Sequence, residues 1–245
     1  MGTENSASRL ATFLMQVRIQ ERDSENRAVD VWKQIFGVSE ETDLLKKAAD
    51  IARLVDEVEA EVRALPEDED PDHLLAYLPQ IRDVLGTFFF ARQVKMHQVM
   101  EKITGEMTYS IATCERALRR NGKVEPMIST ESTGQLLEDV RAIIDDVVSS
   151  DLPNDLKKLL VDRLRGVEAA LLDVRIGGYA NVERAMDALT FGAVRATKPD
   201  SEERARVGSW LSRLWSKLSE HAQGAEAIAS TAASTAEVVK AITGG

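Results

Sequence analysis

The amino-acid sequence predicts an all-α protein, an elongated bundle of seven to nine helices, several of them long. Two observations support this fold class. Glycine (14 residues) and proline (6 residues) are scarce, and aromatic residues make up only 5% of the 245 residues. Apolar residues recur at spacings of three and four along most of the chain, which is typical of amphipathic helices. A many-stranded fold would instead need frequent turns and runs of aromatic or β-branched residues.

The clearest predicted helix begins after Ser39 and ends before Pro66. Its apolar residues alternate spacings of four and three, a heptad pattern typical of helices that pack side by side. These residues are Leu44, Ala48, Ile51, Val55, Val58, Val62 and Leu65. The heptad pattern makes a coiled coil between copies of the chain one expectation for this segment.

A second long helix is predicted from Pro79 to about Arg120, with Gly86 and Gly105 as candidate bends. Together with the preceding segments it would complete an N-terminal helical bundle over residues 1–122. Three consecutive phenylalanines at 88–90 cannot all face one side of a helix. They predict either that neighbours cover this helix on both sides or that one ring is available to a partner.

The stretch 123–131 contains a proline and several Ser and Thr residues, and it is the best candidate for a domain boundary. A C-terminal helical module is expected over 132–200. A terminal helix over 201–245 would complete the chain, with tryptophans in its first half and an alanine-rich second half.

One segment of the C-terminal module resembles a known kind of sequence. It begins Asp151-Leu-Pro-Asn-Asp-Leu-Lys-Lys-Leu-Leu and continues through Val167-Glu-Ala-Ala-Leu to Arg175-Ile-Gly-Gly. This stretch, residues 151–195, is similar to a segment of uncharacterised, all-helical bacterial proteins. The resemblance implies a bacterial source and a helical module, and it implies no activity.

Charge and cysteine content narrow the classes of function and the location. The net charge is −10, and residues 1–78 contain 9 Lys and Arg against 18 Asp and Glu. Nucleic acid is therefore not expected as a partner, because phosphate binding needs a concentrated basic surface. A single cysteine excludes an intramolecular disulfide, and neither a secretory signal nor an apolar run of about 18 residues is recognisable. A cytoplasmic location is expected, with the inner membrane face as a further place of association.

No residues form a recognisable catalytic, cofactor-binding or metal-binding pattern. The three histidines, His73, His97 and His221, lack the spacing to carboxylates that a di-metal site in a helical bundle requires. Cys114 falls on an apolar helix face between Ile111 and Leu118, which indicates a small core residue rather than a nucleophile. No metal, cofactor or catalytic residue is predicted.

The last predicted helix is the most informative segment for function. It combines an apolar face that contains two tryptophans with basic residues, a composition typical of helices that lie on anionic membranes or bind a partner's groove. The predicted contact residues are Arg206, Trp210, Leu211, Arg213, Leu214, Trp215, Lys217 and Leu218. The alternative is that the tryptophans anchor this helix to the bundle. The small residues that follow, among them Ala225, Ala229 and Ala233, would permit close helix packing.

The leading hypothesis from the sequence is a non-enzymatic helical interaction or scaffold protein that acts through self-association or a protein partner. The alternative is a peripheral membrane-acting effector that uses the C-terminal helix 201–243 on an anionic surface. An enzyme of unfamiliar type is the third class, and it would require a polar pocket that the sequence does not reveal.

Overall fold

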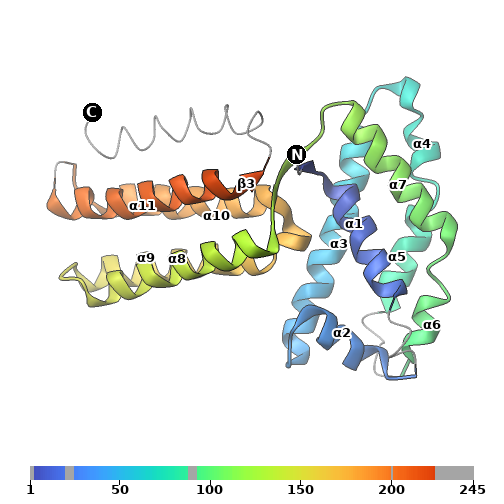
Figure 1. Cartoon of the computed structure of the whole chain (residues 1–245), viewed down its shortest axis with the longest axis horizontal. Coiled ribbons are helices and arrows are strands. Elements are labelled where there is room, and N and C mark those ends of the chain that lie inside the picture. Colours follow the sequence, from blue (N-terminus) through green and yellow to red (C-terminus); the bar gives the residue numbers. More distant parts are fainter. Residues whose placement is uncertain (1–2, 20–24, 88–92, 200, 224–245) are drawn as a thin grey trace. The chain divides into compact units, whose positions relative to one another are not determined.

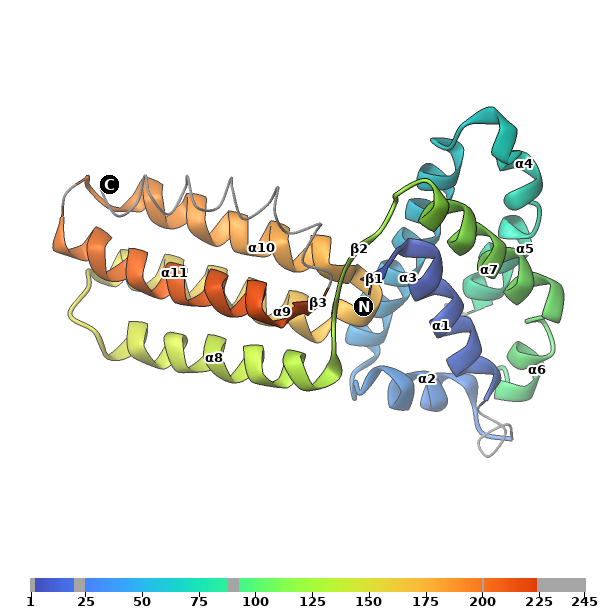
Figure 2. The same ribbon diagram turned by 45° about the horizontal axis from the view of Figure 1, so that its top comes forward.

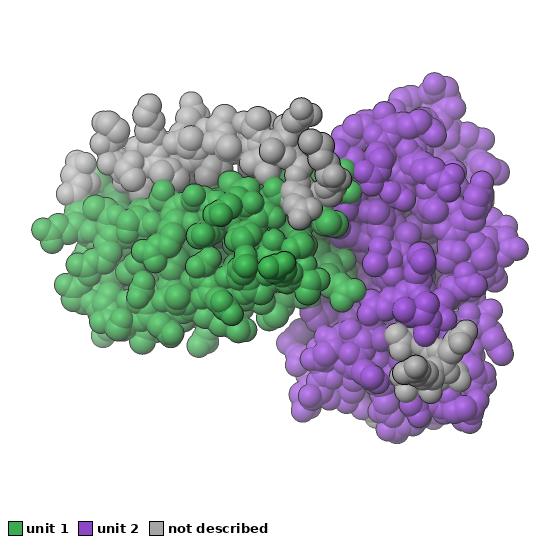
Figure 3. Space-filling model, in the orientation of Figure 1, with its two compact units in different colours: residues 1–3, 125–245 green, residues 4–124 purple. Residues whose placement is uncertain are grey.

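The computed structural model describes residues 3–19, 25–87, 93–199 and 201–223 (Figure 1). It confirms the all-α class, because long stretches of these residues are helical and the strands are only two to four residues long. The chain divides into two compact units, and Figure 3 shows them in different colours. The N-terminal unit consists of residues 4–124, and the C-terminal unit consists of residues 1–3 and 125–245.

The N-terminal unit is built around α3, the longest of its described helices. Helix α3 contacts α1, α2, α4, α5 and α7, while α1 also packs along α7. The α-helices of this unit are α1 (Ser6–Arg18), α2 (Ala28–Phe36), α3 (Glu41–Arg63), α4 (Pro71–Leu74), α5 (Leu78–Gly86), α6 (Met96–Met100) and α7 (Gly105–Arg120). A short 3₁₀ turn, Glu67–Glu69, lies in the acidic loop before α4.

The heptad residues, six on α3 and Leu65 just beyond its end, are all buried inside this unit. Ile51, Val58 and Val62 are completely shielded from solvent, and the other four are at most 7% exposed. Because α3 packs against five helices of its own unit, this apolar face is already covered within one chain. It is therefore not available to form a coiled coil with a second copy.

The prediction of one long helix from Pro79 to about Arg120, with bends at Gly86 and Gly105, is wrong, because the helix is interrupted between these two glycines. Helix α5 ends at Gly86 and α7 begins at Gly105, with the short α6 between them. The backbone around Lys95 is extended and bridges to Arg27, an arrangement that a helix would not permit. The phenylalanines at 88–90 lie outside the described residues.

The C-terminal unit contains four long helices that lie side by side (Figure 2). They are α8 (Thr130–Ser149), α9 (Asn154–Leu172), α10 (Val174–Ala196) and α11 (Glu202–His221). The chain enters through strand β2 (Glu125–Ile128), which lies between β1 (Thr3–Glu4) and β3 (Ala222–Gln223) in a small sheet. Strand β3 pairs antiparallel with β2, with Ile128 opposite Ala222, so the end of α11 is fixed beside the start of α8.

Gly178 permits the sharp kink in α10 that follows the end of α9. Its φ of 66° and ψ of −179° fall in a region that is essentially restricted to glycine. We expect Gly178→Ala to lower the free energy of unfolding of the C-terminal unit by roughly 1–3 kcal/mol, because a side chain at this φ is strained. Hydrogen exchange of α10 amides across a urea series measures this change.

Gly166→Ala is the matched control for that measurement. Gly166 lies within α9, and a Cβ atom there meets no atom within 4 Å. We expect this control to leave the C-terminal unit unchanged or to stabilise it by about 0.5–1 kcal/mol, since alanine favours a helix over glycine. Equal effects of the two substitutions would contradict the assignment of backbone strain to position 178.

Candidate functional site

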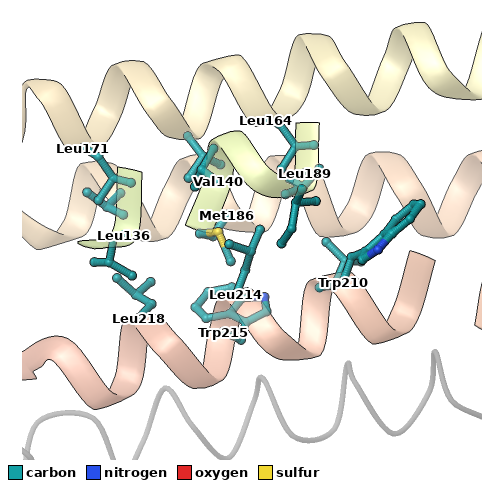
Figure 4. Packing of buried hydrophobic residues seen from close by; sticks show 14 of the residues in the cluster. Leu136, Val140, Leu164, Leu171, Met186, Leu189, Trp210, Leu214, Trp215 and Leu218 are labelled. Atoms are coloured by element: carbon teal, nitrogen blue, oxygen red, sulfur yellow. The ribbon is translucent and has the colours of Figure 1, made fainter. Parts of the chain in front are cut away.

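The predicted contact residues all lie on α11, and the structure separates them by chemistry. The apolar ones lie in the core of the C-terminal unit, in one cluster with residues of α8, α9 and α10 (Figure 4). They are Trp210, Leu211, Leu214, Trp215 and Leu218, each at most 8% exposed. The Trp215 indole Nε1 donates a hydrogen bond to the buried Thr190 hydroxyl at 3.1 Å. Contact of these residues with a membrane or partner would require α11 to leave the bundle.

The charged residues of the predicted set lie on the outer side of α11. Arg206 forms an ion pair with Asp151, and its hydrogen bond holds the pKa of that carboxyl below the ordinary value. Lys217 lies 3.3 Å from Glu220, one turn along the same helix. Arg213 is exposed and lines a shallow pocket with a volume of about 500 Å³. The other residues of this pocket are mostly small, namely Ala205, Gly208, Ser209, Ser212 and Ser216.

Groups suited to binding a metal ion are not assembled in the described part of the chain. No cluster of three or more His, Cys, Asp or Glu suited to a metal ion occurs there. Burial raises the pKa of Cys114 to about 11, so its thiol stays protonated near neutral pH and is a poor nucleophile. His97 lies 3.6 Å from Glu25 and pairs with that exposed carboxylate. No described helix combines the length and apolar character needed to span a membrane.

A buried polar cluster joins the start of α1 to α3. The side chain of Arg9 is 1% exposed and lies 3.3 Å from the Glu57 carboxylate. The Ser6 hydroxyl donates a hydrogen bond of 2.5 Å to Glu61. Burial raises the pKa of Glu61 and also that of Glu4. These contacts hold the first turn of α1 against α3, which is a structural role.

We expect Glu61→Gln to stabilise the N-terminal unit at pH 7 by about 1 kcal/mol or less, because the ionised carboxyl loses hydration in the folded state. The folded pKa of Glu61 lies above the ordinary value of 4.5, so ionisation disfavours folding above that range. The advantage of the variant over wild type should therefore shrink as the pH falls towards 4.5. Urea denaturation at a series of pH values measures this difference.

Glu57→Gln serves as the comparison because it removes the ion pair to Arg9 while preserving side-chain shape. It should destabilise the unit at pH 7, since a buried arginine would lose a charged partner. Stabilisation by both substitutions, or an advantage of Glu61→Gln that grows at low pH, would contradict this description of the cluster.

An open cavity on the N-terminal unit lies between α4 and α7. It has a volume of about 530 Å³, and we refer to it as the tyrosine groove. One wall is the end of α4 with the turn that follows, and the other is the first half of α7. The tyrosine groove is lined by His73, Leu74, Ala76, Tyr77, Gly105, Glu106, Tyr109, Ser110 and Thr113.

Hydrogen bonds fix the two walls of the tyrosine groove together. The Ser110 hydroxyl donates to the Leu74 carbonyl oxygen at 2.9 Å, and the Cys114 thiol donates to the same oxygen at 3.3 Å. The Thr104 side chain caps the start of α7 by accepting a hydrogen bond from the Met107 backbone N–H. The groove is therefore held open by local contacts before any ligand arrives.

Two aromatic rings and one carboxylate dominate the chemistry of the tyrosine groove. Tyr109 is 66% exposed and Tyr77 is 36% exposed, and both count among the exposed large apolar side chains of the protein. Hydrogen bonds from its own backbone N–H and from the Thr104 hydroxyl lower the pKa of Glu106, so it is ionised at neutral pH. The Arg116 guanidinium lies 5.8 Å from the centre of the Tyr109 ring, within range of a cation–π interaction.

Sequence reasoning missed this groove because it joined the lining residues of α7 to a long helix beginning at Pro79, and it predicted no contact between them and α4. Tyr109 lies off the apolar stripe of α7, two residues before the buried Ile111. An aromatic residue off the apolar stripe, together with Tyr77 two residues before Pro79, was the available signal.

Comparison with known proteins gives no further assignment. No family model matches the chain, no curated protein matches it, and no solved structure matches it. Functional inference therefore depends on the geometry of the described residues.

Proposed function

We propose that the protein is a non-enzymatic interaction protein that binds a protein partner through the tyrosine groove. The observation that carries this proposal is the exposure of Tyr77 and Tyr109 on the two walls of one preformed, mostly apolar cavity. Tyrosine is enriched at protein interfaces, because its ring gives a large apolar contact while its hydroxyl remains able to form hydrogen bonds. A groove whose walls are already fixed also requires little ordering on binding, which favours affinity.

The other surfaces considered from the sequence offer weaker support for binding. The heptad residues are buried among helices of the same unit. The surface that the sequence predicted for self-association is therefore covered within one chain. The tryptophans of α11 are likewise buried, so the membrane-acting alternative over residues 201–243 would require the bundle to open. The alanine-rich part of that range, 224–245, lies outside the described residues.

A cytoplasmic location is part of the same proposal. The single cysteine of the chain is buried and free, as suits a reducing compartment. The resemblance of residues 151–195 to bacterial helical proteins makes a bacterial cytoplasm the proposed setting.

Quantitative affinity capture from an extract of the source cells tests the proposed function. The tagged full chain is compared with Tyr109→Ala and with Phe191→Ala, because Phe191 is an aromatic residue of similar exposure (59%) on the C-terminal unit. We expect at least one protein to be captured by wild type and by Phe191→Ala but lost with Tyr109→Ala. An unchanged set of captured proteins with all three chains would overturn the proposal.

A further inference from the structure

We propose that the tyrosine groove recognises a peptide segment of its partner through an arginine or lysine side chain, placed between the rings of Tyr77 and Tyr109 and the carboxylate of Glu106. This inference rests on the proposed function and adds the chemistry of the partner. It combines three observations: exposed aromatic rings, an ionised carboxylate in the same cavity, and an acidic stretch beside one wall.

The ring of Tyr109 already accepts a guanidinium group. Arg116, two turns further along α7, lies 5.8 Å from the ring centre. A ring has two faces, and Tyr109 remains 66% exposed with this contact in place. A second cation can therefore approach the open part of the ring, which attracts positive charge through its π electrons.

Glu106 gives the cavity a negative charge that is available to a ligand. Within the described residues it forms no ion pair, and its side chain is exposed. Its lowered pKa follows from hydrogen bonds at the start of α7, so a ligand would meet the carboxylate rather than the neutral acid. Coulomb attraction near a protein surface favours a cation there and disfavours an anion.

The acidic run 67–72 leads into the wall formed by α4 and includes the first two residues of that helix. In that run Glu69 pairs with Arg120 and Asp72 pairs with Arg63, while Glu67 and Asp68 are exposed and have no ion-pair partner in the described part of the chain. Residues 4–124 together contain 17 Lys and Arg against 22 Asp and Glu. Arg116, which lies beside the groove, is included in this balance and does not reverse it.

The dimensions of the groove favour a peptide over a single small cation. Its lining on α7 extends from Gly105 to Thr113, which corresponds to about 12 Å at 1.5 Å per residue. Leu74 and Ala76 add apolar surface beside the rings. A segment with a cationic side chain flanked by apolar ones would fill this length, and the negative charge of Glu106 and of the nearby run 67–72 would attract it in a salt-dependent manner.

A matched pair of peptides tests this chemistry on the full chain. The probes are acetyl-LRLLRL-amide and the same peptide with both arginines replaced by citrulline, which keeps the shape and removes the charge. Binding is followed through the aromatic ring resonances of Tyr77 and Tyr109. We expect shifts at both rings, and a Kd about five- to tenfold lower for the arginine peptide, from one cation–π contact and one charge contact.

Three variants separate the contributions. Glu106→Gln should remove most of the preference for the arginine peptide, and Tyr109→Leu should weaken binding of both peptides. Arg116→Met should tighten binding of the arginine peptide, because it frees a ring face and removes a like charge. Phe191→Leu should change nothing.

Equal affinity for the two peptides, the absence of shifts at Tyr77 and Tyr109, or weaker binding to Arg116→Met would overturn the cationic-peptide inference. Those results leave the capture experiment unaffected. A capture experiment that fails while the arginine peptide binds as expected would instead overturn the proposed cellular function.

Discussion

Trp215→Ala is expected to lower the free energy of unfolding of the C-terminal unit by about 3–5 kcal/mol, the usual cost of truncating a large buried aromatic residue. Trp215 is 6% exposed and packs in the core formed by all four helices of this unit. Its truncation also removes the hydrogen bond from the indole to Thr190. Hydrogen exchange of α8–α11 amides across a urea series measures the loss.

Arg213→Ala is the control on the opposite side of the same helix. Arg213 is exposed, and a surface substitution of this kind is expected to change stability by at most about 0.5 kcal/mol. If Trp215→Ala were as mild as Arg213→Ala, the apolar side of α11 would not belong to the core. The membrane-acting alternative over residues 201–243 would then regain support.

Ile51→Ala is the second substitution with a large expected effect, about 2–5 kcal/mol of lost stability in the N-terminal unit. Ile51 is completely buried at the centre of the heptad pattern, on the face of α3 that packs within one chain. Because the contacts are intramolecular, the urea midpoint should not change with protein concentration. Denaturation at two concentrations about 100-fold apart tests both statements.

Leu45→Ala is the matched control, since Leu45 lies on the same helix and is 50% exposed. Its effect should be at most about 0.5 kcal/mol. A midpoint that rises with protein concentration in the wild-type chain would show that the heptad face is shared between copies. Self-association would then replace partner binding as the leading function.

The sequence predicted the helices that have a regular apolar pattern and a capping residue directly before their first turn. Helix α3 follows its heptad residues closely, and Ser201 caps α11 by accepting a hydrogen bond from the Arg204 backbone N–H. Both signals act within a few residues, so they can be recognised without knowledge of the tertiary structure.

The break between α5 and α7 could not be predicted in the same way. The Ala28 backbone N–H donates to the Val94 carbonyl oxygen at 2.8 Å, and the Met96 backbone N–H donates to that of Asn26 at 3.0 Å. These bonds join residues 66 and 70 positions apart, and they keep Val94 and Lys95 out of a helix before α6 begins at Met96. A local apolar pattern contains no information about such partners.

The tyrosine groove depends on that same break. The hydrogen bond between Ser110 and Leu74 can form only because α7 is a separate helix that packs against α4.

The amphipathic pattern of α11 was ambiguous for a different reason. An apolar face with tryptophans has the same sequence whether it packs in a core or on a membrane.

Site-specific photo-crosslinking most directly tests the claim that the tyrosine groove binds a partner. A photoreactive phenylalanine is placed at position 109 and, as a control, at position 191, which has similar exposure on the other unit. We expect a discrete crosslinked product from position 109, absent from position 191 and suppressed when Tyr77→Ala is added. No product at 109, or the same product at both positions, would contradict the assignment of partner binding to this groove.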